Sequence, residues 1–121
     1  MVTVRIGILV VGDELTRGMI GDRNTAYLAR AIQEEGWEVS FSTLSGDGGE
    51  DIAAAFRFLL ARSRAVVVTG GLGPTADDRT TEFLARALGR GCYIDERALR
   101  HIRERFTFLG IPWTENNAKQ A

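Results

Sequence analysis

The chain is poor in the residues on which much enzyme chemistry depends: its 121 residues include one cysteine, one histidine and one lysine. A single cysteine cannot form an intrachain disulfide, which fits a reducing compartment. Cys92 and His101 together supply too few ligands for a zinc site. Because Lys119 is the only lysine, a P-loop is excluded, since its motif needs a lysine directly after the last glycine. We expect Cys92 to be a small half-buried residue and His101 to lie on the surface.

A strong charge of either sign and a long apolar run are also missing. The formal net charge is −1, which gives no electrostatic attraction toward nucleic acid or an anionic membrane. No apolar run approaches the ~20 residues of a membrane span, and the N-terminus lacks a signal-peptide pattern. With 45% hydrophobic and 26% charged residues, the sequence predicts one soluble domain over residues 1–121, located in the cytoplasm.

Short apolar runs alternate with helical patterns along the chain. We expect strands at 5–11, 38–44 and 65–69, a further short strand at 92–94, and helices at 24–35, 47–60, 79–88 and 95–109. This order predicts an α/β protein, a three-layer α/β/α sandwich with a mostly parallel sheet. The helical spacing places in the core the residues Tyr27, Leu28, Ala31, Ile32, Ile52, Ala55, Phe56, Leu59, Leu60, Phe83, Leu84, Ala87, Leu88, Leu99, Ile102, Phe106 and Leu109.

Residues 66–80 are the most informative stretch. Three valines read as a buried strand, and the glycine-rich turn 70–73 follows at once. Glycines let backbone N–H groups approach an anionic or planar ligand, and the start of the next helix favours phosphate. Asp77 and Asp78 would repel such a ligand unless a metal ion or a proton lay between, so the stretch suggests metal-assisted nucleotide or pterin chemistry. The alternative is a tight turn in which Asp77 or Asp78 caps the helix.

Three loops should meet at the edge formed by the carboxyl ends of the strands: 12–24, 45–50 and 70–80. In extended backbone, Asp13 and Glu14 would point opposite ways and could not both reach one metal ion. Asp22 or Asn24 alternatively caps the following helix, and Asp47 is expected to cap the helix that it precedes.

Four motifs follow one another along the chain: Gly12-Asp13-Glu14-Leu15, Asn24-Thr25-Ala26-Tyr27-Leu28-Ala29, Thr69-Gly70-Gly71-Leu72-Gly73-Pro74-Thr75-x-Asp77-Asp78-x-Thr80, and Glu115-Asn116-Asn117-x-Lys119-Gln120-Ala121. Together they resemble the N-terminal domain of CinA, the competence- and damage-inducible protein A, within the wider molybdopterin-binding fold of MoaB, MogA and gephyrin. The resemblance runs over essentially the whole chain. Members of that family continue well past Ala121, so the natural protein is expected to continue as well.

The resemblance implies a nucleotide or pterin site at the carboxyl edge of the sheet. It assigns catalysis to Asp47 and Asp78, with Asp78 holding a divalent ion such as Mg²⁺, together with Asp47 or Asp77. Lys119 would stabilise charge on the leaving phosphate. Asn116 and Asn117 would contact ribose or base, although by chemistry alone they read as helix-start residues. The full set of expected ligand-binding residues is Gly12, Asp13, Glu14, Asn24, Gly70, Gly71, Leu72, Gly73, Pro74, Thr75, Asp77, Thr80, Asn116, Asn117 and Lys119.

Three functions remain open. The first is metal-dependent hydrolysis of the pyrophosphate bond in ADP-ribose or a similar nucleotide diphosphate, the activity associated with CinA-type domains. The second is adenylylation of molybdopterin in molybdenum cofactor biosynthesis, but those relatives carry a threonine where this chain has Leu72. The third is a binding module without turnover. The resemblance also implies a homo-oligomer, a dimer or a trimer. CinA-type domains often lie beside a C-terminal domain that deamidates nicotinamide mononucleotide, which is not part of this sequence.

Overall fold

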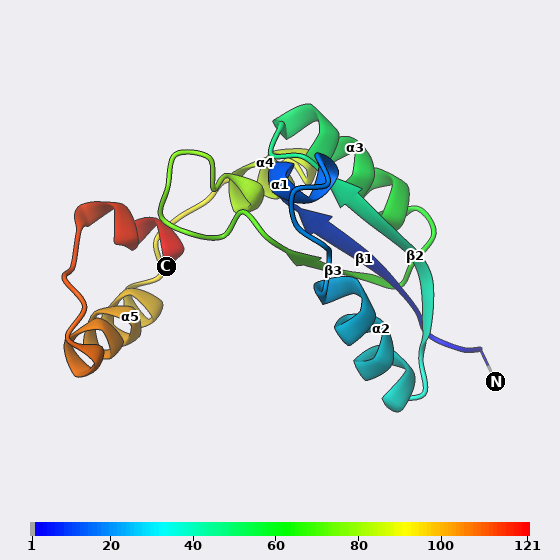
Figure 1. Cartoon of the computed structure of the whole chain (residues 1–121), viewed down its shortest axis with the longest axis horizontal. Helices are drawn as coiled ribbons and strands as arrows, with labels where there is room; N and C mark the ends of the chain where they lie inside the picture. Colours follow the sequence, from blue (N-terminus) through cyan, green and yellow to red (C-terminus); the bar gives the residue numbers. More distant parts are fainter. Residues whose placement is uncertain (1) are drawn as a thin grey trace.

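The computed structural model describes residues 2–121 and contains a small parallel sheet with helices on both faces (Figure 1). The elements in chain order are β1 (Arg5–Val11), α1 (Asp13–Thr16), α2 (Asn24–Glu34), β2 (Glu38–Ser45), α3 (Gly49–Leu60), β3 (Ala65–Thr69), α4 (Thr80–Ala87), α5 (Glu96–Leu109) and the 3₁₀ helix η1 (Glu115–Gln120).

The sheet has the strand order β2-β1-β3, and both pairs are parallel. β1 lies in the middle, which explains why its sequence is an almost continuous apolar run: it has a neighbouring strand on each side and a helix layer on each face. The register between β1 and β2 shifts between Ile6 and Gly7. There the hydroxyl of Ser40 donates to the carbonyl of Ile6 at 3.1 Å.

Two separate apolar cores lie on the two faces of the sheet. On one face, Leu9 and Val11 of β1 pack against α3, with Phe83 and neighbouring residues of α4 added to the same cluster. On the other face, Ile8 and Val10 pack against Ile32 of α2. The alternation of β1 side chains between these clusters confirms the predicted three-layer α/β/α arrangement.

Several local predictions were wrong. Residues 92–94 form no strand, and the backbone N–H of Asp95, which follows them, donates to the carbonyl of Ala121 rather than to a strand of the sheet. Tyr27 is 68% exposed because it lies one position off the stripe by which α2 contacts the sheet. Leu60, Leu88 and Leu109 are also exposed, since each lies at the very end of its helix. Cys92 is exposed rather than half-buried. His101 lies on the surface, as expected.

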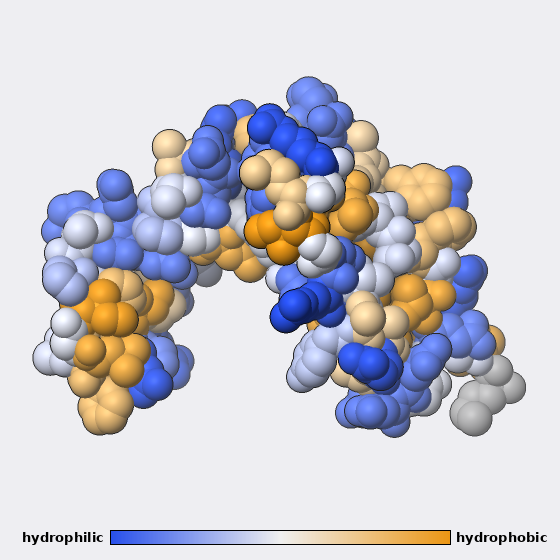
Figure 2. All heavy atoms as spheres, in the orientation of Figure 1, coloured by the Kyte–Doolittle hydropathy of each residue, from blue (hydrophilic) through white to orange (hydrophobic). Residues whose placement is uncertain are grey.

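α5 and η1 form an arm that extends away from the sheet (Figure 1). Asp95 caps α5 as predicted, by accepting a 2.8 Å hydrogen bond from the backbone N–H of Ala98. Phe106 of α5 packs edge-to-face on Trp113 with ring centroids 5.4 Å apart, and this contact holds the arm together. Figure 2 shows an arched molecule with a hollow between the arm and the sheet, and apolar side chains gather near the tip of the arm. Phe108 of α5 is 78% exposed.

Within the described part of the chain, no helix combines the length and the apolar character needed to cross a membrane.

Candidate functional site

The carboxyl ends of the three strands meet at one edge of the sheet, where β1, β2 and β3 lead into Gly12, Gly46 and Gly70. The backbone N–H of Gly12 donates to the carbonyl of Ser45 at 2.8 Å, so the first two loops begin side by side. The predicted convergence of the loops is therefore confirmed for this edge.

The glycine turn has a backbone conformation that residues other than glycine rarely adopt. Gly70 and Gly71 have φ values of 92° and 63°, in the left-handed region. A Cβ atom on Gly70 would lie 2.0 Å from the carbonyl oxygen of Val11, and one on Gly71 would lie 2.2 Å from Oγ1 of Thr80. Both glycines are required because the turn passes directly over β1 and over the first residue of α4.

Thr80 stabilises the turn through two hydrogen bonds. Its side chain is fully buried, and its hydroxyl donates to the carbonyl of Gly70 at 2.8 Å. Its backbone N–H donates to the carbonyl of Gly71 at 3.2 Å. The carbonyls are thereby turned toward the protein. The N–H groups of Gly71 and Leu72, by contrast, find no acceptor among residues 2–121.

Asp78 closes the loop that follows the turn. One carboxylate oxygen accepts hydrogen bonds from the backbone N–H of Thr75 at 2.9 Å and from its hydroxyl at 2.6 Å. The side-chain bond from Thr75 is the main reason that the pKa of Asp78 lies below its usual value, and the charge of Lys119 acts in the same direction. Lys119 itself donates to the carbonyl of Thr75 at 2.5 Å. This contact thus joins the fourth sequence motif, which contains Lys119, to the third, which contains Thr75.

Asp78 does not act as a helix cap. The residue before α4 is Arg79, and no side chain caps that helix. The alternative of an N-cap aspartate at 77 or 78 is therefore wrong; the carboxylate of Asp78 stabilises the preceding loop instead. Asp22 does cap α2 in effect, since it accepts from the backbone N–H groups of Asn24 and Thr25.

A cavity of about 230 Å³ lies against the turn. Its lining contains five of the predicted site residues and four residues that the sequence did not single out for the site. The predicted ones are Gly71, Leu72, Gly73, Asp78 and Lys119, and the others are Arg79, Thr81, Glu82 and Cys92. Sequence analysis missed Arg79 and Glu82 because they fall at unspecified positions beside the motif residues.

A cluster of acidic side chains occupies the neighbouring loops. One carboxylate oxygen of Asp13 accepts a 2.8 Å hydrogen bond from the backbone N–H of Asp47, which joins the loops after β1 and β2. Partial burial raises the pKa of Asp47, and the negative charges of Asp13, Glu14 and Asp77 raise it further. Asp47 thus lies in an acidic environment, whereas Lys119 is the charged neighbour of Asp78.

Two predictions about these loops were wrong. Asp13 and Glu14 belong to the short helix α1 rather than to extended backbone, so they do not point opposite ways along a strand. Asp47 does not cap α3, because the helix begins at Gly49 and Gly48 takes the cap position without a side-chain bond. A helix that starts at Gly49 leaves the Asp47 side chain outside its first turn.

The remaining predicted residues lie at different distances from the turn. Glu14, Asn24 and Gly70 line a second hollow, of about 500 Å³, on the α2 side of the edge. Pro74 is half-buried within the loop. Asn117 is buried in η1 and accepts from the backbone N–H and the hydroxyl of Thr114, which is a helix-start role. Asn116 is exposed.

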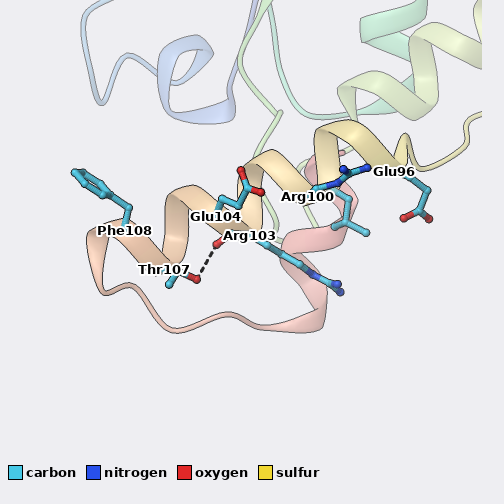
Figure 3. A pocket seen from close by; sticks show the side chains of 7 residues that line it. Glu96, Arg100, Arg103, Glu104, Thr107 and Phe108 are labelled. Carbon is cyan, nitrogen blue, oxygen red and sulfur yellow. Dashed lines mark hydrogen bonds between the residues drawn. The ribbon is translucent and has the colours of Figure 1, made fainter.

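A broad depression of about 600 Å³ runs along α5 and is lined only by residues of that helix (Figure 3). Charged side chains such as Glu96, Arg100 and Arg103 line it, and Phe108 lies at one end. None of the predicted site residues contributes to it, so this depression is not part of the candidate site.

The chain matches known proteins over nearly its whole length. The model of a family described as "Probable molybdopterin binding domain" matches residues 7–118. A CinA-like protein from Syntrophus aciditrophicus is 47% identical over 118 residues, and one from Anaeromyxobacter is 42% identical over 118 residues. Each match covers 98% of this chain but only 28% and 29% of those proteins, so the chain spans less than a third of their lengths.

Solved structures agree with the fold. A crystal structure of the protein CinA from Thermoplasma acidophilum, of unknown function, has a TM-score of 0.86 at 32% identity, and the match covers 97% of this chain and 68% of that one. The molybdopterin biosynthesis enzyme MoaB from Thermus thermophilus has a TM-score of 0.66 at 27% identity, with coverage of 69% and 54%. The chain belongs to the molybdopterin-binding domain family, and its relatives within that family are CinA-like proteins.

Proposed function

We propose that this chain binds a nucleotide diphosphate of the ADP-ribose type at the glycine turn and hydrolyses its pyrophosphate bond with the help of a divalent metal ion. The observation that carries the proposal is the cavity in which the turn, Asp78 and Lys119 meet. It combines backbone donors, a carboxylate and an ammonium group within a space of about 230 Å³.

Backbone and side chains have separate roles in this proposal. The N–H groups of Gly71 and Leu72 are the donors that would bind phosphate oxygens, because Thr80 holds the carbonyls of the turn on the other side. Lys119 would stabilise charge on the leaving phosphate, and its bond to Thr75 already orients it. The hydrogen bonds from Thr75 lower the pKa of Asp78 below its ordinary value, so they favour its ionised form.

The donor set fits a magnesium ion bound partly by the ligand. No three histidine, cysteine, aspartate or glutamate side chains within residues 2–121 lie close enough together to hold a metal ion. Mg²⁺ is usually held by one or two carboxylates, substrate phosphates and water, so Asp78, with Asp47 or Asp77, suffices as its protein contribution. When bound, the ion would neutralise the diphosphate and lower the pKa of the attacking water.

The test is release of AMP from ADP-ribose, followed by chromatography with Mg²⁺ and after its removal with EDTA. We expect AMP only with the metal, and a loss of at least ~10²-fold in turnover in Asp78→Asn, in line with the several kcal/mol that metal sites supply. Asp51→Asn is the matched control, because Asp51 is an exposed aspartate in the first turn of α3 and does not line the cavity. Equal turnover in both variants would refute the role of Asp78.

Molybdopterin binding or adenylylation is the second candidate, favoured by the family description and by the similarity to MoaB. Leu72 argues against adenylylation, because the adenylylating relatives have a threonine hydroxyl at that position. Adenylylated pterin formed from molybdopterin and ATP, with no AMP from ADP-ribose, would decide for the second candidate. Binding of either ligand without turnover would indicate a non-catalytic module.

A further inference from the structure

The cavity beside the glycine turn contains a second cation that the motifs do not explain. Arg79 lines the cavity together with Lys119, and its guanidinium group is bound to Glu82. The contact is bidentate: Nε and Nη2 of Arg79 donate to the two carboxylate oxygens of Glu82 at 2.9 and 2.8 Å. Such a fork fits a phosphate group as well as it fits a carboxylate.

Glu82 has another cationic partner outside the cavity. Nη2 of Arg86, one helical turn further along α4, lies 2.7 Å from the Glu82 carboxylate. Arg86 does not line the cavity. If Arg79 turns away from Glu82, the carboxylate therefore still has a positive charge beside it.

Little holds Arg79 to Glu82 beyond this contact. The two side chains are 43% and 38% exposed, and an ion pair with that exposure contributes little to stability. The guanidinium carbon of Arg79 also lies 4.6 Å from the ring centre of Phe83, a contact that does not involve Glu82. A ligand phosphate could thus take over the guanidinium group at small cost.

We propose that Arg79 is an anion-binding residue of this site, held by Glu82 in the free protein and transferred to a phosphate group of the ligand on binding. The inference rests on the proposed function for the kind of ligand, a diphosphate ester, but not for turnover. Lys119 and Arg79 would then both contact the same diphosphate, and Glu82 would compete with that diphosphate for the guanidinium group of Arg79.

The test is calorimetric titration of the 121-residue chain with inorganic pyrophosphate and with ADP-ribose, at low ionic strength and without divalent metal. Arg79→Gln should weaken binding of both about tenfold or more, as expected for loss of a bidentate charged contact. Glu82→Gln should tighten binding several-fold, because the competing carboxylate is gone. Circular dichroism checks that each variant is folded.

Arg86 provides the matched control. In the Glu82→Gln background, adding Arg86→Gln should leave the affinity within about twofold, whereas adding Arg79→Gln should still lower it about tenfold. Equal losses from the two arginine changes would mean a general effect of charge and would overturn the proposal. So would a Glu82→Gln variant that binds no more tightly than the unaltered chain, or an unaltered chain that binds neither probe. If binding follows this pattern but the assay with Mg²⁺ gives no AMP from ADP-ribose, the role of Arg79 is retained and the hydrolase proposal alone is refuted.

Discussion

Replacement of Gly71 by alanine tests whether the shape of the turn depends on its contact with Thr80. Two separate effects should lower the free energy of unfolding of this variant. A non-glycine residue at φ 63° is strained by about 1–2 kcal/mol. The new Cβ would also lie 2.2 Å from Oγ1 of Thr80, which must give up its bond to the carbonyl of Gly70 and leave a buried acceptor unpaired, at about 1–3 kcal/mol.

The sum is about 2–5 kcal/mol, a large share of the about 5–15 kcal/mol that stabilises a typical domain. Urea denaturation followed by circular dichroism measures it. Gly89→Ala is the matched control, because Gly89 has a φ of 66° and a Cβ atom there would have none of the described residues within 4 Å. That variant should lose only the backbone strain, about 1–2 kcal/mol.

A double-mutant cycle separates the two costs. In a Thr80→Ala background the obstructing oxygen is absent, so Gly71→Ala should then cost only about 1–2 kcal/mol, as Gly89→Ala does. If Gly71→Ala costs no more than Gly89→Ala in the unaltered chain, or the same in both backgrounds, the steric reasoning is refuted.

Two further predictions concern the carboxylates of the site. Asp78→Asn should destabilise the chain at pH 7. Because hydrogen bonds lower the pKa of Asp78 in the folded chain, its ionised carboxylate contributes fully to the free energy of unfolding above the ordinary pKa of 3.8. This contribution is lost as the pH falls through the lower pKa of the folded state. Urea denaturation from pH 7 to pH 3 should therefore show the gap between the variant and the unaltered chain closing at the acid end. Asp47→Asn should do the opposite and raise the melting temperature at pH 7, since burial and neighbouring charges disfavour the ionised form. This gain should vanish as the pH falls toward 3.8, and a lower melting temperature at pH 7 would contradict it.

The layers of the fold could be predicted from the sequence because they rest on local patterns. The apolar run of β1 indicates a strand covered on both faces, and it forms the centre of the sheet. Asp95 and Gly110 delimit α5 as their cap chemistry predicts. The short helix α1 was not predictable in this way, since four residues are too few to show a helical period.

The site was predictable as a set of loops but not as a set of contacts. The bond from Lys119 to Thr75 joins residues 44 positions apart, and no local pattern reports such a distance. The same holds for Asp13 and Asp47, 34 positions apart, whose contact depends on the parallel pairing of β1 and β2. Arg79 and Glu82 are close in sequence, but only the cavity indicates that they belong to the site.

The charges at the sheet edge are separated in a way that bears on the proposed chemistry. Asp13, Glu14 and Asp77 act together on Asp47, and together they make one side of the edge negative. On the other side, Lys119 lowers the pKa values of both Asp78 and Glu82, after the larger effects of their hydrogen bonds. A diphosphate would be attracted to the second side and a divalent cation to the first, and Asp78 is next to Asp77 in the chain. This separation agrees with the proposed function, in which Asp78, with Asp47 or Asp77, would hold the metal ion and the turn would bind the phosphate.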